Sequence, residues 1–146
     1  MADYITSQQL EDAGACQHQV SDFKKRFRAG RARVTIARAK ALADVYDWRW
    51  AARHLLPAPA RRAYMAATAP ARRAYEAASK QARQDFNSAL AEAWKAYDAA
   101  GTAEALHAVS VVTAQGWQAY YSAVAPARQA LNQAEAESFA RAYLGS

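Results

Sequence analysis

The hexapeptide PARRAY occurs at residues 59–64 and again at residues 70–75, so its two copies begin eleven residues apart. The same spacing separates four aromatic residues: Tyr64, Tyr75, Phe86 and Tyr97. Eleven residues make three helical turns at about 3.67 residues per turn, which is close to the period of a straight α-helix. The repeat therefore predicts a long helix over residues 59–98 that returns an aromatic ring to one face every three turns.

The composition of the whole chain favours the same class of structure. Its 146 residues include 41 alanines but only 17 valines, isoleucines and leucines together. Alanine is the strongest helix former, whereas β-branched residues are those that strands prefer. We therefore expect an all-α protein whose core depends on aromatic side chains, because alanine buries little apolar area.

A second long helix is predicted over residues 103–144. Trp94 and Tyr97 of the first arm recur three residues apart as Trp117 and Tyr120, and the sequence PARQAL at 126–131 echoes PARRAY. Between the arms, Gly101-Thr102 offers a glycine to end one helix and a threonine to cap the next. Two such arms joined by so short a connection predict an antiparallel helical hairpin.

Two prolines interrupt these arms. Pro70 and Pro126 are expected to kink the helices, since proline lacks a backbone N–H and its ring clashes with the preceding turn. At Pro70 a second reading stays open, in which one helix ends and another begins with Thr68 as its cap.

The first 57 residues are predicted to form a cluster of short helices, at about residues 7–13, 15–28, 36–43 and 48–56. Thr6, Thr35 and Asp47 are placed to cap three of them. Pro57 and Pro59 then break the chain before the repeat begins. The expected organisation is a basic N-terminal module at residues 1–57 and an Ala/Tyr-rich hairpin at residues 58–146, together forming one continuous folding unit.

No arrangement of residues in the sequence points to catalysis or to a metal. The five glycines are scattered singly, so no phosphate-binding loop is present, and the histidines do not combine with the single cysteine, Cys16, at metal-ligand spacing. Cys16 is expected to be a small buried residue rather than a nucleophile. The sequence therefore predicts a protein that is not an enzyme and needs no metal or cofactor.

Charge is the strongest functional signal. The net charge is +6, but residues 23–83 alone carry sixteen bases and three acids. Eight bases lie within seventeen residues without an acid among them, and we take them as the candidate binding residues: Lys24, Lys25, Arg26, Arg28, Arg31, Arg33, Arg38 and Lys40. Such a set binds phosphates, binds an acidic protein surface, or merely forms a solvated face.

An exposed aromatic ring is also expected. Tyr120 and Tyr121 are adjacent, so only one of them can face the seam of the hairpin. Tyr121 is therefore added to the candidate binding residues, because tyrosine supplies contact area with a polar tip.

The sequence also predicts where the protein works. The start of the chain lacks the basic and apolar segments of a signal peptide, and the longest stretch without charge, residues 105–127, is too polar for a membrane span. A single cysteine fits a reducing compartment. We expect a soluble, cytoplasmic protein.

AGACQHQVSDFKKRF at residues 13–27 and VYDWRWAARHLLP at residues 45–57, followed by tyrosine-bearing repeats, resemble small proteins encoded by tailed bacteriophages and prophages. The resemblance implies an accessory phage protein in the bacterial cytoplasm and carries over no catalytic residue. The leading hypothesis is thus an interaction protein that occupies a surface of a host defence complex and inhibits it. The alternatives are a nucleic-acid-binding protein and an assembly protein that self-associates through the Ala/Tyr stripe.

Overall fold

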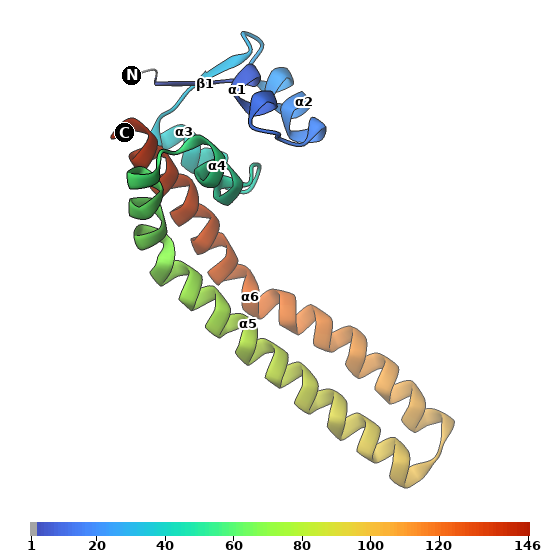
Figure 1. The fold of residues 1–146 in the computed structure, drawn as a ribbon. Helices are drawn as coiled ribbons and strands as arrows, with labels where there is room; N and C mark the ends of the chain where they lie inside the picture. The colour runs from blue at the N-terminus through green and yellow to red at the C-terminus, as the bar shows by residue number, and fades with distance from the viewer. Residues whose placement is uncertain (1–2) are drawn as a thin grey trace. The chain divides into compact units, whose positions relative to one another are not determined.

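The computed structural model describes residues 3–146. Its elements follow in the order β1 Tyr4–Thr6, α1 Ser7–Asp12, α2 Gln17–Arg26, β2 Arg31–Arg33, α3 Ile36–Ala41, α4 Trp48–Leu55, α5 Ala58–Ala100 and α6 Ala103–Leu144 (Figure 1). The predicted all-α class is confirmed: along the chain a set of short helices comes first, and the two long helices that follow pack as a hairpin.

The short helices begin where their capping residues predict. Thr6 forms a capping box with Gln9, in which the Thr6 side chain accepts from the Gln9 amide and the Gln9 side chain accepts from the Thr6 amide. Thr35 caps α3 and Asp47 caps α4 in the same manner, each accepting from an amide three residues on. These bonds satisfy backbone donors that a helix start otherwise leaves open.

One feature of the N-terminal region was not expected from the sequence. β1 and β2 pair as a two-stranded antiparallel sheet in which Ile5 lies opposite Ala32 and Tyr4 opposite Arg33. Each strand has three residues, too few for an alternating pattern to stand out. The sheet fixes the start of the chain beside the connection between α2 and α3.

Both prolines lie inside unbroken helices. The reading in which a new helix starts at Pro70 with Thr68 as its cap is wrong, because α5 continues through both residues. The Thr68 side chain is fully buried, and its hydroxyl donates to the Tyr64 carbonyl one turn earlier at 3.0 Å. Back-bonding of this kind keeps a buried hydroxyl satisfied within the helix.

The chain forms two compact units, which we name by their content. The head unit comprises the residues up to Ala69 together with Leu131–Ser146, and the hairpin unit comprises Pro70–Ala130. The boundary expected after residue 57 falls inside the head unit, because the first turns of α5 and the last turns of α6 pack with the short helices.

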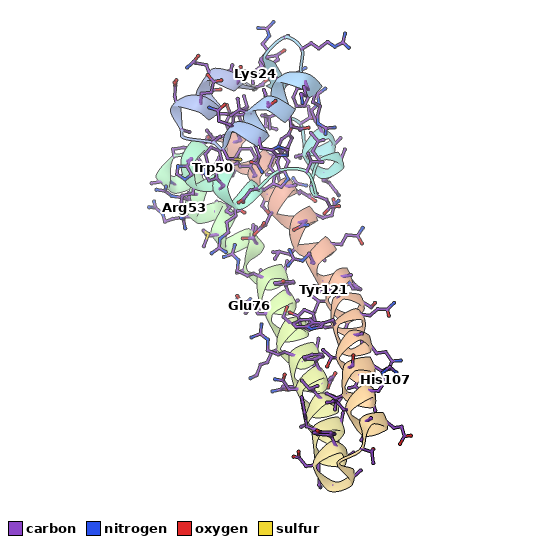
Figure 2. The ribbon with its side chains drawn as sticks, turned by 90° about the vertical axis from the view of Figure 1, so that its right-hand side faces the viewer. Lys24, Trp50, Arg53, Glu76, His107 and Tyr121 are labelled. Atoms are coloured by element: carbon purple, nitrogen blue, oxygen red, sulfur yellow. The ribbon has the colours of Figure 1, made fainter. Side chains whose placement is uncertain are left out.

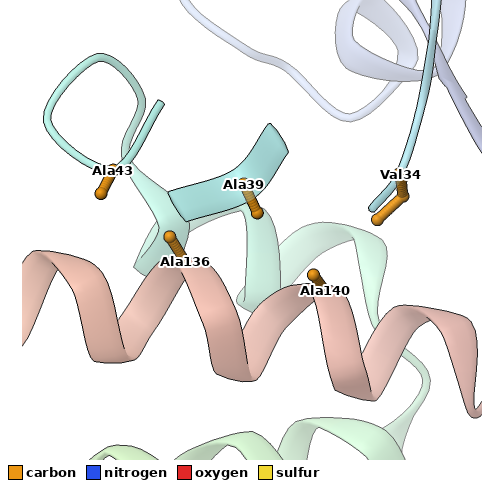
Figure 3. Close-up of a cluster of buried hydrophobic side chains, with 5 residues drawn as sticks. All are labelled: Val34, Ala39, Ala43, Ala136 and Ala140. Atoms are coloured by element: carbon orange, nitrogen blue, oxygen red, sulfur yellow. The ribbon is translucent and has the colours of Figure 1, made fainter. Parts of the chain in front are cut away.

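The head unit has a core of small and aromatic side chains. Figure 3 shows part of it, where two alanines of α6 meet α3 and the segments beside it; the buried side chains of this cluster are Val34, Ala39, Ala43, Ala136 and Ala140. Next to them, Phe139 is fully buried against Trp48, with ring centroids 5.4 Å apart. Alanines let the helix backbones approach closely, and the rings fill the remaining space.

The hairpin unit is held by the predicted aromatic face of α5. Phe86 packs on Trp117 of α6 with ring centroids 4.8 Å apart, and the Tyr75 hydroxyl accepts a 2.6 Å hydrogen bond from Arg128. Gly101 ends α5 with a φ of 62°, a left-handed conformation that glycine adopts without strain. The eleven-residue spacing thus aligns the seam between the two long helices.

Candidate interaction surface

The eight candidate basic residues all lie in the head unit, on α2, β2, α3 and the segment between α2 and β2, and all are exposed. They do not form one free cationic patch. Four of them pair with carboxylates of the head unit, as Lys24–Glu11, Arg26–Asp22, Arg33–Asp3 and Lys40–Glu137. Asp3, Glu11 and Glu137 come from other parts of the head unit, whereas Asp22 lies one turn before Arg26 on α2. All four lie outside the run from Lys24 to Lys40, which is why the run looked unopposed in the sequence.

The other four bases have different surroundings. The guanidinium of Arg31 lies over the Tyr4 ring at 5.2 Å, and that of Arg38 lies over the Phe27 ring at 5.8 Å. Among the residues that the structure describes, Lys25 and Arg28 form no ion pair and donate no side-chain hydrogen bond. Within this set of eight bases, the unpaired charges that remain are therefore those of Lys25 and Arg28, near the end of α2.

A half-buried tyrosine, Tyr46, contacts α2 through Asp22. The Tyr46 hydroxyl donates to Asp22 at 2.8 Å, and burial, followed by this hydrogen bond, raises the pKa of Tyr46 to about 12. The same hydrogen bond, helped by Arg26, lowers the pKa of Asp22 below its usual value. At neutral pH the pair is therefore a neutral phenol bound to a carboxylate, which suits a structural brace and not proton transfer.

A second group of cations was not singled out from the sequence. α4 and the start of α5 expose four arginines, and α4 also carries a stacked aromatic pair. We call this set the α4 basic surface: Arg49, Arg53, Arg61 and Arg62, with Trp50 and His54. Arg49 and Arg53 are one turn apart on α4, and Arg61 reaches α4 by donating to the Arg53 carbonyl at 3.0 Å. Figure 2 shows Trp50 and Arg53 on the head unit.

The α4 basic surface has no carboxylate partner within residues 3–146. None of its four arginines forms an ion pair there, whereas half of the earlier set does. The sequence does indicate this excess of positive charge, because residues 48–75 contain no Asp or Glu. The arginines lie on both sides of the break at Pro57, and the hydrogen bond from Arg61 to the Arg53 carbonyl connects the two sides.

Tyr121 is exposed as predicted, at 66% of its surface. It stacks on Trp117 with centroids 6.0 Å apart, and Trp117 is itself 47% exposed. Figure 2 shows Tyr121 on α6. Tyr121 belongs to the hairpin unit, and the basic residues belong to the head unit. The predicted binding residues therefore fall on two separate surfaces.

Two hollows lie in the head unit. A core cavity of about 80 Å³ is lined mainly by apolar side chains, including Phe23, Trp48 and Phe139. A shallow groove of about 380 Å³ lies beside Asp12, His54 and other residues of α1, α4 and α6. Across the described part of the chain, no three His, Cys, Asp or Glu side chains gather where they could hold a metal ion.

The prediction for Cys16 is wrong. It was expected to be buried, but it is exposed at the position that precedes α2. The residue stands in a capping position without making a capping bond, so its side chain turns to solvent.

Comparison with known proteins gives no relative. No family model matches the chain, and neither a curated protein nor a solved structure is significantly similar to it. No helix among the described residues has the length and apolar character needed to cross a membrane.

Proposed function

We propose that this chain is a non-catalytic interaction protein whose head unit docks on an acidic surface of a partner protein. The α4 basic surface carries the proposal, because α4 and the first turn of α5 expose four arginines that have no carboxylate partner among the described residues, and α4 also carries the stacked Trp50 and His54. Arginine and tryptophan are the residues most enriched where protein interfaces concentrate their binding energy. Docking an acidic partner there would supply the missing carboxylates.

Nucleic acid is the second candidate, and the same arginines favour it. Guanidinium groups bind phosphates, and Trp50 offers a face on which a base can stack. The residues first selected for this role, from Lys24 to Lys40, support it less well. Four of them already face carboxylates that would have to be displaced or would repel the phosphates.

The biological setting follows from the resemblance alone. A phage accessory protein that acts without catalysis can work by covering a surface of a host protein, and inhibition of a defence complex is our hypothesis for its purpose. The cytoplasm of the bacterial host is the compartment that this hypothesis requires.

A capture experiment with charge-reversed variants tests the proposal. The tagged full chain is incubated with bacterial lysate, either treated with nuclease or left untreated, and compared with R53E/R62E. We expect a stoichiometric protein that survives nuclease and is lost in R53E/R62E. R73E/K80E is the matched control, because it changes the net charge equally through two exposed residues of the hairpin unit.

Two results would contradict the proposal. Recovery of nucleic acid alone, abolished by nuclease and falling steeply with salt, would assign the surface to phosphate binding. Equal loss of the partner in R53E/R62E and R73E/K80E would show that only overall charge matters. A third variant, K25E/R28E, reports whether the free end of α2 belongs to the same surface.

A further inference from the structure

The core cavity of the head unit, which we call the head cavity, offers a site for an apolar group. It has a volume of about 80 Å³ and is bordered by side chains of α2, α3, α4 and α6, including Phe23, Leu42, Ala51 and Phe139. Water inside a protein needs about two to four polar partners, and walls made mainly of apolar side chains do not provide them. The head cavity therefore favours an apolar occupant over water.

The cavity follows from a core that combines alanines with large rings. Four alanines of the head unit line it: Ala15, Ala32, Ala39 and Ala51. A methyl group leaves space beside a large neighbour unless that neighbour can move into the space. The persistence of the cavity thus depends on how firmly the rings are held.

The rings that line the cavity are held by one another and by the backbone. Phe23 packs on Phe27 with ring centroids 4.9 Å apart. Trp48 packs on Phe139 at 5.4 Å, and its indole donates a 3.2 Å hydrogen bond to the Leu42 carbonyl. These contacts oppose a collapse of the rings into the cavity, so the site is formed before a ligand arrives.

Among the residues that the structure describes, three charged ones border the cavity. Arg33 pairs with Asp3 at 3.7 Å, and Asp47 caps α4 by accepting from the Trp50 amide. Arg38 forms no ion pair with any of residues 3–146. It is exposed, so an uncompensated cation lies at the rim of an apolar cavity.

The Arg38 guanidinium is oriented but keeps donors for a ligand. It lies over the Phe27 ring at 5.8 Å, and its Nη1 donates to the Arg33 carbonyl at 2.8 Å. Arginine carries several N–H donors in a planar fork that matches a carboxylate. The donors on Nε and Nη2 therefore remain for an anion at the rim.

The volume limits the apolar part of the ligand. Benzene fills an engineered apolar cavity of about 150 Å³. At that ratio the head cavity, at about 80 Å³, holds roughly three carbon atoms, which is the size of an isopropyl group.

We infer that the head cavity binds a compact branched aliphatic group joined to a carboxylate, with the aliphatic group inside and the carboxylate on Arg38. The charge stays at the rim, where water still reaches it, so the ligand avoids the cost of burying an ion. Two molecules carry this chemistry: a free short-chain acid such as isovalerate, and the C-terminal valine of a polypeptide. Arg53 and Arg62 of the α4 basic surface do not line the cavity.

An NMR titration of the isotope-labelled full chain with isovalerate, at constant ionic strength, tests the inference. We expect saturable shifts of the Trp48 and Trp50 indole signals, with a dissociation constant on the order of 1 mM for so small a ligand. Acetate has the carboxylate without the branched group, and isobutanol has the branched group without the charge. Each should bind roughly tenfold more weakly than isovalerate.

R38Q should weaken isovalerate binding by roughly tenfold and leave isobutanol binding unchanged. R31Q is the matched control, because Arg31 is also exposed and lies over a ring, that of Tyr4, but does not line the cavity. A51L should fill the cavity and abolish the binding of both ligands. A63L, which enlarges an exposed alanine outside the cavity, should bind them like the wild type. Circular dichroism confirms that each variant keeps its helices.

A wild-type chain without saturable shifts would overturn the inference, as would acetate that binds as tightly as isovalerate. Equal effects of R38Q and R31Q would contradict the role of Arg38. A peptide with a free C-terminal valine separates the two sources, because tighter binding than isovalerate assigns the site to a protein C-terminus and no binding assigns it to a free acid. R53E/R62E should bind isovalerate like the wild type, so the result is independent of whether the α4 basic surface binds an acidic partner.

Discussion

At the scale of single residues, the clearest link between sequence and packing joins Gly116 to Phe86. A Cβ atom added at Gly116 would lie 2.3 Å from the Phe86 ring, so the ring occupies the space that any side chain would need. The same ring packs on Trp117 at 4.8 Å, which limits its freedom to move. Glycine weakens a helix interior, yet α6 continues through Gly116, and the glycine admits a ring of the eleven-residue repeat.

Replacing Gly116 with alanine should therefore destabilise the protein. Alanine improves the helix by about 1 kcal/mol. Overpacking costs about 1–3 kcal/mol, so we expect a net loss of about 1 kcal/mol in the free energy of unfolding, measured by urea denaturation. In an F86L background the smaller side chain leaves room, and the same substitution should stabilise instead. Equal effects in both backgrounds would show that the contact does not constrain residue 116.

At the scale of elements, the short helices are positioned by their caps. None of α1, α3 and α4 exceeds eight residues, and helices of this length are not stable in isolation. Each begins at a threonine or aspartate whose side chain accepts from a backbone amide three residues on. Their starts were readable from sequence because capping is a local interaction. The three helices end one to two residues earlier than the sequence predicts, because tertiary packing determines where the last turn stops.

The cap of α4 offers a direct test, because this helix carries much of the α4 basic surface. Asp47 accepts from the Trp50 amide at 2.8 Å. D47A should lower the free energy of unfolding by about 1 kcal/mol, whereas D47N should cost much less because asparagine also caps. Thermal and urea unfolding measure both variants. Similar losses in the two would mean that the Asp47 charge, and not the cap, stabilises α4.

At the scale of the whole molecule, the head unit joins the two ends of the chain. Tyr143 near the C-terminus donates to the Tyr4 carbonyl at 2.8 Å, and Asn132 donates to Asp44 at the same distance. Phe139 lies fully buried between the short helices and the start of α5. The N-terminal module therefore depends on the last turns of α6.

Substitution at Phe139 tests this dependence. F139A removes a fully buried ring and should lower the free energy of unfolding by about 3–5 kcal/mol. L144A is the control, because Leu144 lies in the same helix end but is 41% exposed, and it should lose less than about 1 kcal/mol. Urea unfolding followed by tryptophan fluorescence measures both. A small loss in F139A would mean that the short helices hold together without α6.

The sequence by itself determined the long helices, their turn and their seam. Alanine content, the eleven-residue period and the pair Gly101-Thr102 act through local backbone preference and helix geometry, and these need no knowledge of distant residues. The exposure of Tyr121 followed from the same geometry, since adjacent residues on a helix cannot share a face.

Only the tertiary structure decided which charges are free. The run from Lys24 to Lys40 looked unopposed, yet Asp3, Glu11 and Glu137 reach it from elsewhere, while the arginines of α4 and α5 come together without an acid. For the same reason, neither the sheet of β1 and β2 nor the burial of Phe139 could be predicted from the sequence. Ion pairs, short strand pairs and hydrophobic cores join residues that are far apart in the chain, so no local sequence pattern predicts these contacts.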